Sequence, residues 1–208
     1  MKEPQHFLDG DLIVIDDFYL DAPAVRARAL ALNYDGPGEN GHYPGIQSTD
    51  ALVAAGLEKT FSQLAGVDLM PAVGAVYGKI RVGLEDQVGE VAVHIDHVDW
   101  SAIIYLNDPP AGQFSGLSVV RHRELPAARI DSKLLDELGL DDRKEFDKTW
   151  VRPYNELKHW ERVETVGCRA NRLVLLKSGS YCHVIEEVFG NDLETGRMTH
   201  SFFMDEAA

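Results

Sequence analysis

The last two thirds of the chain are a succession of short segments rich in β-branched and aromatic residues, and this pattern restricts the fold more than any other feature. The segments follow one another between residues 75 and 205, with turn-forming residues between them. Many short strands of this kind predict an antiparallel sandwich or barrel, so we expect a mainly β protein with flanking helices. The segments are AVYGKIRV, EVAVHID, SAIIYLN, LSVVRHR, ERVETV, NRLVLLK, YCHVIEEVF and RMTHSFFMD.

The first third of the chain is expected to be partly helical. DLIVIDDFY predicts a strand, after which Asp21 can cap a helix over APAVRARALAL. The Gly- and Pro-rich residues 34–47 predict a loop. A second helix is expected to follow a cap at Ser48, Thr49 or Asp50 and to end at Gly66, with an apolar face formed by Leu52, Val53, Leu57, Phe61 and Leu64.

Residues 125–160 interrupt the β pattern. DSKLLDELGL reads as a capped helix, and DDRKEFDKTW can continue it. We expect this helical insertion to be a lid or a wall of a substrate site. The 208 residues therefore predict a single domain, with a helical part over about 1–70 and a β core over about 71–208 that carries the insertion.

Composition restricts the partners. The 34 acidic residues exceed the 20 basic ones, and the net charge of −14 argues against nucleic acid and against an anionic membrane surface. Any anionic ligand must then be held by a few well-placed cations. The first residues are polar, no apolar run approaches a membrane span, and the two cysteines form no disulfide framework. We expect a cytoplasmic protein; its oligomeric state stays open, a homodimer included.

Two overlapping His-x-Asp pairs lie in VAVHIDHVDW. On a strand, residues two apart point to the same face, so His94 and Asp96 present an imidazole and a carboxylate side by side. His97 and Asp99 have the same spacing but lie beyond the apolar run, where a turn is expected. A strand holds ligands more firmly than a turn, and we therefore favour the first pair.

A third ligand and a cation come from later strands. His183 would complete a set of two histidines and one carboxylate, the facial triad of non-haem Fe(II), which leaves metal positions open. Arg197 and Thr199 share one face of the last strand. Arginine can bind a carboxylate through two parallel hydrogen bonds, and a hydroxyl can add a third.

The order of these pieces resembles the Fe(II)/2-oxoglutarate-dependent dioxygenases. HID at 94–96, IIYLND at 103–108, Gly116, NRLVLLKSGSYCH at 171–183 and RMT at 197–199 resemble the prolyl-hydroxylase and phytanoyl-hydroxylase branches. DDFYLDAPAVRARAL followed by YPG resembles the start of an uncharacterised bacterial subfamily. The resemblance extends from about residue 11 to 204, is weak across 125–160, and implies a double-stranded β-helix, the cupin-like jelly roll.

The resemblance also implies roles for individual residues. His94, Asp96 and His183 would bind Fe(II), and Arg197 would pair with the far carboxylate of 2-oxoglutarate, which Tyr105 and, less strongly, Thr199 would also contact. Tyr77 and Arg81 are further candidates for the pocket wall. Because related halogenases lack the ligand carboxylate, Asp96 implies hydroxylation or another oxidation without halide. The expected reaction is hydroxylation of a small molecule, amino acid or peptide side chain, with release of succinate and CO₂.

Other interpretations remain open from the sequence. A non-catalytic cupin-like module could use the same ligands to hold a metal or a small acid, and a jelly roll without metal could serve only protein contacts. A histidine on a sheet is commonly a hydrogen-bonded core residue. Arg197 could instead be a structural ion-pair partner of Glu186 or Glu194. The cation and phenol at Arg197 and Tyr105 favour the enzyme, since a module that only binds metal needs neither.

Overall fold

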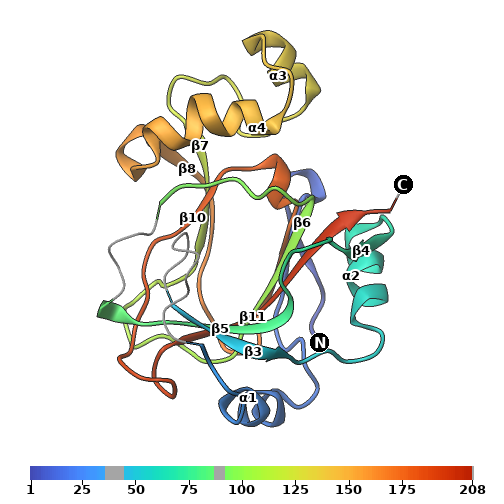
Figure 1. The fold of residues 1–208 in the computed structure, drawn as a ribbon, viewed down its shortest axis with the longest axis vertical. Helices are drawn as coiled ribbons and strands as arrows, with labels where there is room; N and C mark the ends of the chain where they lie inside the picture. Colours follow the sequence, from blue (N-terminus) through green and yellow to red (C-terminus); the bar gives the residue numbers. More distant parts are fainter. Residues whose placement is uncertain (36–44, 87–91, 208) are drawn as a thin grey trace.

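Two antiparallel β-sheets face each other in the computed structural model, which describes residues 1–35, 45–86 and 92–207 (Figure 1). The larger sheet has the order β1-β2-β9-β6-β11-β5-β3, with β4 paired to β11, and the smaller sheet has the order β10-β7-β8. This arrangement is a jelly roll, as expected. The strands are β1 Gln5–Phe7, β2 Leu12–Ile15, β3 Ile46–Ala51, β4 Leu69–Pro71, β5 Tyr77–Gly83, β6 Trp100–Tyr105, β7 Leu117–His122, β8 Trp160–Val166, β9 Leu173–Leu176, β10 His183–Ile185 and β11 Arg197–Glu206.

Each face of the larger sheet has its own packing layer. The face toward the smaller sheet contributes Tyr105 and Val174, which pack with Leu117 and Val119 of β7. The opposite face is covered by helices α1 (Ala22–Leu30) and α2 (Leu57–Ala65). Alternation along each strand therefore sorts side chains into an interior set, between the sheets, and an outer set, under the helices.

The residues expected to form an insertion are largely helical and pack on the smaller sheet. Trp160 of β8 and Val184 of β10 share a buried cluster with Leu134 and Phe146 of the helical segment. Figure 1 shows this segment at one end of the molecule, beyond the sheets. Its elements are α3 Ser132–Leu138, α4 Arg143–Phe146, a π-helical turn Asp147–Val151 and the 3₁₀ turns Arg152–Tyr154 and Leu157–His159; other 3₁₀ turns are Leu8–Gly10 and Ser178–Ser180.

The first helix and its cap match the sequence prediction, but the start of the second does not. Asp21 accepts a hydrogen bond from Ala24 N and caps α1. Residues 48–50, expected to cap the second helix, lie in β3 instead, at the point where its pairing with β5 is interrupted. Ser48 forms a bridge with Tyr34, and Thr49 N donates to Asn33 O at 2.9 Å. The helix begins only after Gly56, which adopts a left-handed conformation, and it ends at Gly66 as expected.

The segment EVAVHID is not the regular strand that its alternation predicts. In the part that the structure describes, which begins at residue 92, His94 forms an isolated bridge with His183 and no ladder continues on either side. The alternation of side chains still holds, because Val93 and Ile95 are buried in the cluster under the helical segment. Most of the loop expected over 34–47 lies outside the described residues. Among the residues described, no helix is both long and apolar enough to cross a lipid bilayer.

Candidate functional site

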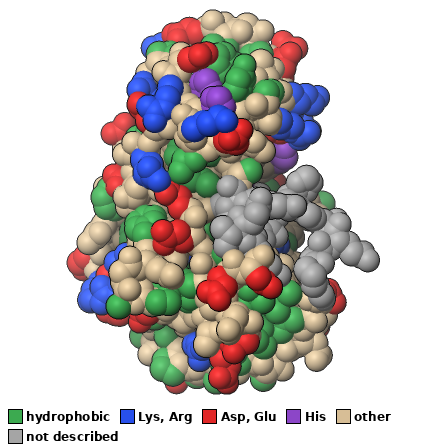
Figure 2. All heavy atoms as spheres, turned by 90° about the vertical axis from the view of Figure 1, so that its left-hand side faces the viewer, with side chains coloured by type: hydrophobic (Ala, Val, Ile, Leu, Met, Phe, Trp, Pro, Cys, Tyr) green, Lys and Arg blue, Asp and Glu red, His purple; other side chains and the backbone are tan. Residues whose placement is uncertain are grey.

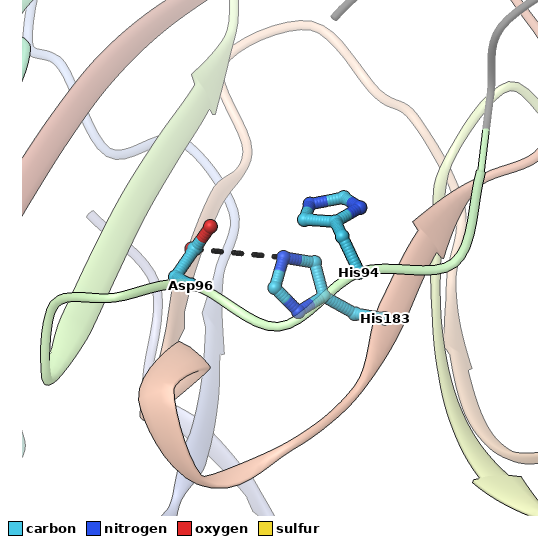
Figure 3. Close-up of side chains that lie close together, drawn as sticks. All are labelled: His94, Asp96 and His183. Carbon is cyan, nitrogen blue, oxygen red and sulfur yellow. Dashed lines mark ion pairs between the residues drawn. The ribbon is translucent and has the colours of Figure 1, made fainter. Parts of the chain in front are cut away.

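Three side chains that the sequence singled out converge between the sheets. His94, Asp96 and His183 each offer a ligand atom, and these atoms lie within 4.8 Å of one another. The two imidazole rings are 4.2 Å apart between centroids, and His183 Nε2 lies 3.6 Å from Asp96 Oδ2. Figure 3 shows the carboxylate and both rings pointing toward a common region.

The backbone brings these residues together in two places. His94 N donates to His183 O at 3.1 Å, and His183 N donates to His94 O at 2.9 Å, which fixes the two histidines opposite each other. Asp96 N donates to Ser178 O at 3.3 Å, in the turn that leads to His183. A reciprocal pair of backbone bonds thus positions two ligands that lie 89 residues apart in the chain.

Both rings are oriented by backbone carbonyls. His94 Nδ1 lies 3.0 Å from Ala92 O, and His183 Nδ1 lies 3.0 Å from Tyr181 O. A carbonyl oxygen can only accept, so each Nδ1 carries the proton and each Nε2 is left with a lone pair. Imidazoles that bind metals are typically held in this way, with the remote nitrogen donating to a carbonyl or carboxylate.

The electrostatics of the site favour metal binding over protonation. Burial lowers the pKa of His94 to about 4, and the neighbouring His183 adds to the shift, while Asp96 partly opposes it. The His94 ring is therefore neutral near pH 7, as a metal ligand must be. Two imidazole nitrogens and one buried carboxylate match the donor set that binds Fe(II) with open coordination positions.

The second His-x-Asp pair has a different role. Asp99 accepts a hydrogen bond from Arg143 at 2.9 Å, and His97 Nε2 lies 3.6 Å from Asp147 Oδ2. Arg143 and Asp147 both belong to the helical segment. His97 and Asp99 therefore connect this segment to the residues that directly follow Asp96. The preference for His94 and Asp96 over this pair agrees with the geometry.

Arg197 is a buried cation without a counter-charge in the described part of the chain. It is 4% exposed, its Nε donates to Ser115 O at 2.9 Å, and its guanidinium carbon lies 5.0 Å from the centroid of the Tyr105 ring. No carboxylate of the described residues lies within ion-pair distance of it. The structural alternative is not observed among the described residues, because Glu186 pairs with Arg162 and neither Glu186 nor Glu194 forms an ion pair with Arg197.

Two buried polar atoms next to Arg197 also have no hydrogen-bond partner. These are the Tyr105 hydroxyl and Ser115 Oγ, which have no partner in the part of the chain that the structure describes. Burial raises the pKa of Tyr105, so its hydroxyl keeps its proton and can donate. Buried polar atoms are rarely unpaired in proteins, and a cation with two adjacent unpaired hydroxyls describes a space suited to an anion. Thr199, which pairs with Tyr105 in the sheet register, lies on the same interior face.

The uncertain candidates Tyr77 and Arg81 lie on opposite faces of the larger sheet. The Tyr77 ring packs on Phe202, with 5.0 Å between centroids, in the outer cluster under the helices. Arg81 pairs with Thr199 in the register and therefore faces the interior. Sequence reasoning missed Ser115, which has a positive φ of 43°. The adjacent Gly116, which belongs to the family resemblance, was the sequence feature nearest to Ser115. A Cβ at Gly116 would lie 2.0 Å from Val166 O, so the chain has no room for a side chain there.

Comparison with known proteins adds evidence for the fold. No protein-family profile matches the sequence, and no curated protein matches it. One similar structure is the non-heme alpha ketoglutarate dependent epimerase SnoN from nogalamycin biosynthesis, with a TM-score of 0.52 and 15% identity over 95% of this chain and 79% of that one. Another is HygX from Streptomyces hygroscopicus with nickel, 2-oxoglutarate and hygromycin B bound, with a TM-score of 0.50 and 11% identity over 95% and 83%. The chain shares their fold.

Proposed function

We propose that the chain is a non-haem Fe(II)/2-oxoglutarate-dependent oxygenase of the hydroxylase type. The observation that carries the proposal is the pairing of a His94–Asp96–His183 cluster with the buried Arg197, which has no counter-charge among the described residues, inside the same jelly roll. A metal site alone would not need that cation. HygX, which shares the fold, was solved with a metal and 2-oxoglutarate bound, and this supports the choice of cofactors.

Each residue has a defined task under this proposal. His94, Asp96 and His183 would hold the metal on one side and leave its other positions open. Arg197 would bind the far carboxylate of 2-oxoglutarate, and the Tyr105 hydroxyl would donate a further hydrogen bond, with Thr199 beside it. Fe(II), 2-oxoglutarate and O₂ would together supply oxidation of a substrate C–H bond, with release of succinate and CO₂.

The substrate is proposed to be a small molecule, an amino acid or a peptide side chain. We propose that residues 1–208 act as one domain in which the helical segment over about 125–160 forms a wall of the substrate site. The contacts of Asp99 with Arg143 and of His97 with Asp147 support this role, since they join the segment to the ligand-bearing chain.

Two buried free thiols, Cys168 and Cys182, fit the reducing conditions of the cytoplasm.

The test has a binding step and a turnover step. Isothermal titration of 2-oxoglutarate into Fe(II)-loaded protein without oxygen should give metal-dependent binding, and admission of O₂ should convert 2-oxoglutarate to succinate. His94→Ala and Asp96→Ala should abolish both by removing the metal. If both variants keep the metal affinity of the wild type, the proposal fails. Metal binding with no affinity for 2-oxoglutarate would instead support the non-catalytic cupin-like module.

A further inference from the structure

The backbone around Arg197 is held on both sides by one side chain. Asn107 Nδ2 donates to Gly196 O at 2.8 Å, and Met198 N donates to Asn107 Oδ1 at 3.0 Å. Arg197 N itself donates to Phe189 O at 3.1 Å. These three bonds fix the position of the Arg197 backbone, and they leave the direction of its long side chain to other contacts.

The direction of the Arg197 side chain is set by Ser115. Arg197 Nε donates to Ser115 O at 2.9 Å, and both residues are buried. Ser115 has a φ of 43°, a left-handed conformation that a residue with a side chain adopts only at a cost in free energy. Such a conformation persists only where the surrounding structure holds it. The contacts that hold the Ser115 backbone therefore also decide where the guanidinium points.

Glu187 supplies such a contact from a distant part of the chain. Its Oε2 accepts from Phe114 N at 3.0 Å and from Ser115 N at 3.3 Å. A carboxylate that binds two consecutive amide groups favours one conformation of the backbone that carries them. The contacts form a ring, because Glu187 binds Ser115, Ser115 binds Arg197, and Arg197 N binds Phe189, two residues after Glu187.

The charge of Glu187 does not distinguish it from other acidic residues. Acidic side chains are scattered over the face shown in Figure 2, as expected for a chain with a net charge of −14. A carboxylate near an anion site repels the anion, so loss of the charge alone would strengthen the binding of an anionic ligand. Loss of a contact that orients Arg197 would weaken it. The two effects of Glu187 therefore have opposite signs.

We propose that Glu187 is a positioning residue, which acts through Ser115 to aim the Arg197 guanidinium at the far carboxylate of 2-oxoglutarate. This inference rests on the proposed function, because it takes Arg197 as the partner of that carboxylate. Glu187 is exposed and bonds to backbone amides, so its effect on the ligand is indirect. The effect is also selective, because Glu187 serves the end of the ligand that Arg197 binds and not the end that the metal would bind.

The test compares two ligands that differ only at the far end. 2-Oxopentanoate has the same 2-oxo acid as 2-oxoglutarate and a methyl group in place of the far carboxylate. Both are titrated by calorimetry into Zn(II)-loaded protein. Glu187→Ala should weaken the binding of 2-oxoglutarate about tenfold, since a hydrogen bond to a charged group contributes roughly that factor. Glu187→Gln should weaken it less, because the amide oxygen still accepts.

The controls separate this role from a general one. Neither substitution of Glu187 should change the affinity for 2-oxopentanoate, because that ligand has no group for Arg197 to bind. Glu58→Ala removes an acidic side chain at an exposed position of α2, and it should leave both affinities unchanged.

A second measurement follows Arg197 without any ligand. Its Nε–H signal, assigned in a nitrogen-15 NMR spectrum by its loss in Arg197→Gln, should exchange slowly with solvent because the group is buried and bonded to Ser115 O. Glu187→Ala should speed this exchange about tenfold, by the same loss of one charge-assisted bond. The backbone amide of Arg197, which is bonded to Phe189 O, should keep its protection.

Separate outcomes identify separate failures. Unchanged or tighter binding of 2-oxoglutarate in Glu187→Ala overturns the inference, and tighter binding would show that only charge repulsion was removed. An equal loss for both ligands also overturns it, because the role of Glu187 would then be general to the fold. If the wild type does not prefer 2-oxoglutarate to 2-oxopentanoate, the proposed function is wrong. Faster exchange at Arg197 Nε in Glu187→Ala would then still establish that Glu187 positions this side chain, and unchanged exchange would refute it.

Discussion

Replacing Arg197 with glutamine separates a ligand-binding cation from a structural one. The side chain is 4% exposed, and its hydrogen bond within the described residues, to Ser115 O, uses Nε and leaves the outer nitrogens for a ligand. If these nitrogens bind the far carboxylate of 2-oxoglutarate, Arg197→Gln removes two charge-assisted bonds. Each contributes about 1.5–2 kcal/mol, so the loss is about 3–4 kcal/mol, or on the order of 10²–10³ in Kd.

The same substitution should have little effect on the stability of the ligand-free protein. Loss of the bond to Ser115 costs about 1 kcal/mol, and removal of a buried charge without a counter-ion offsets much of that cost. The free energy of unfolding should therefore change by less than about 1 kcal/mol. A member of a buried structural ion pair would instead cost about 3–5 kcal/mol.

Two measurements on one preparation decide between these roles. Titration calorimetry with Zn(II)-loaded protein gives the Kd for 2-oxoglutarate, and urea unfolding of the metal-free protein gives stability. Arg162→Gln is the matched control, because it removes a cation whose side chain is 51% exposed and which pairs with Glu186. A variant that unfolds several kcal/mol more easily and still binds 2-oxoglutarate like the wild type would refute the reasoning.

Three further outcomes are expected. Arg143→Ala removes the hydrogen bonds of 2.9 Å that Arg143 donates to Asp99 and to Gly179 O. It should weaken Zn(II) binding about tenfold in a competition titration, and an unchanged affinity would contradict this prediction. His200 has a pKa lowered by burial to about 4, so it is neutral when folded and charged when unfolded between that pH and about 6.5. Stability should therefore fall as pH drops through this window, by on the order of 3 kcal/mol at most, and His200→Gln should show a shallower pH dependence in urea unfolding. Phe61→Ala should lower the free energy of unfolding by about 3–5 kcal/mol, because the ring is fully buried and its centroid lies 5.2 Å from that of Phe202. A smaller loss in thermal unfolding would show that the side chains under α2 move in to fill the cavity.

Local chemistry made the ligand pair predictable. His94 and Asp96 are two residues apart, so alternation alone puts them on one side, and this survived even though the segment is not a regular strand. The loss of the strand has a tertiary cause, because the backbone of 93–96 bonds to Asn155, His183 and Ser178 in place of one continuous partner. The capping prediction at residues 48–50 failed for the same kind of reason, because Ser48 bridges Tyr34 and Thr49 N donates to Asn33 O, which holds these residues in an extended strand.

The sequence by itself determined the residue types of the site and their order along the chain, because spacing, side-chain chemistry and family resemblance are properties of short segments. Only the tertiary structure decided that Arg197 has no counter-charge among the described residues. Arg197 could have paired with Glu186, but that carboxylate pairs with Arg162 of β8. Likewise, the sequence makes Arg81 and Tyr77 equally good candidates for the pocket wall. The register of β5 against β11 turns only Arg81 toward the interior, and Tyr77 packs on Phe202 in the outer cluster. Strand register depends on contacts between distant segments, and no local pattern encodes it.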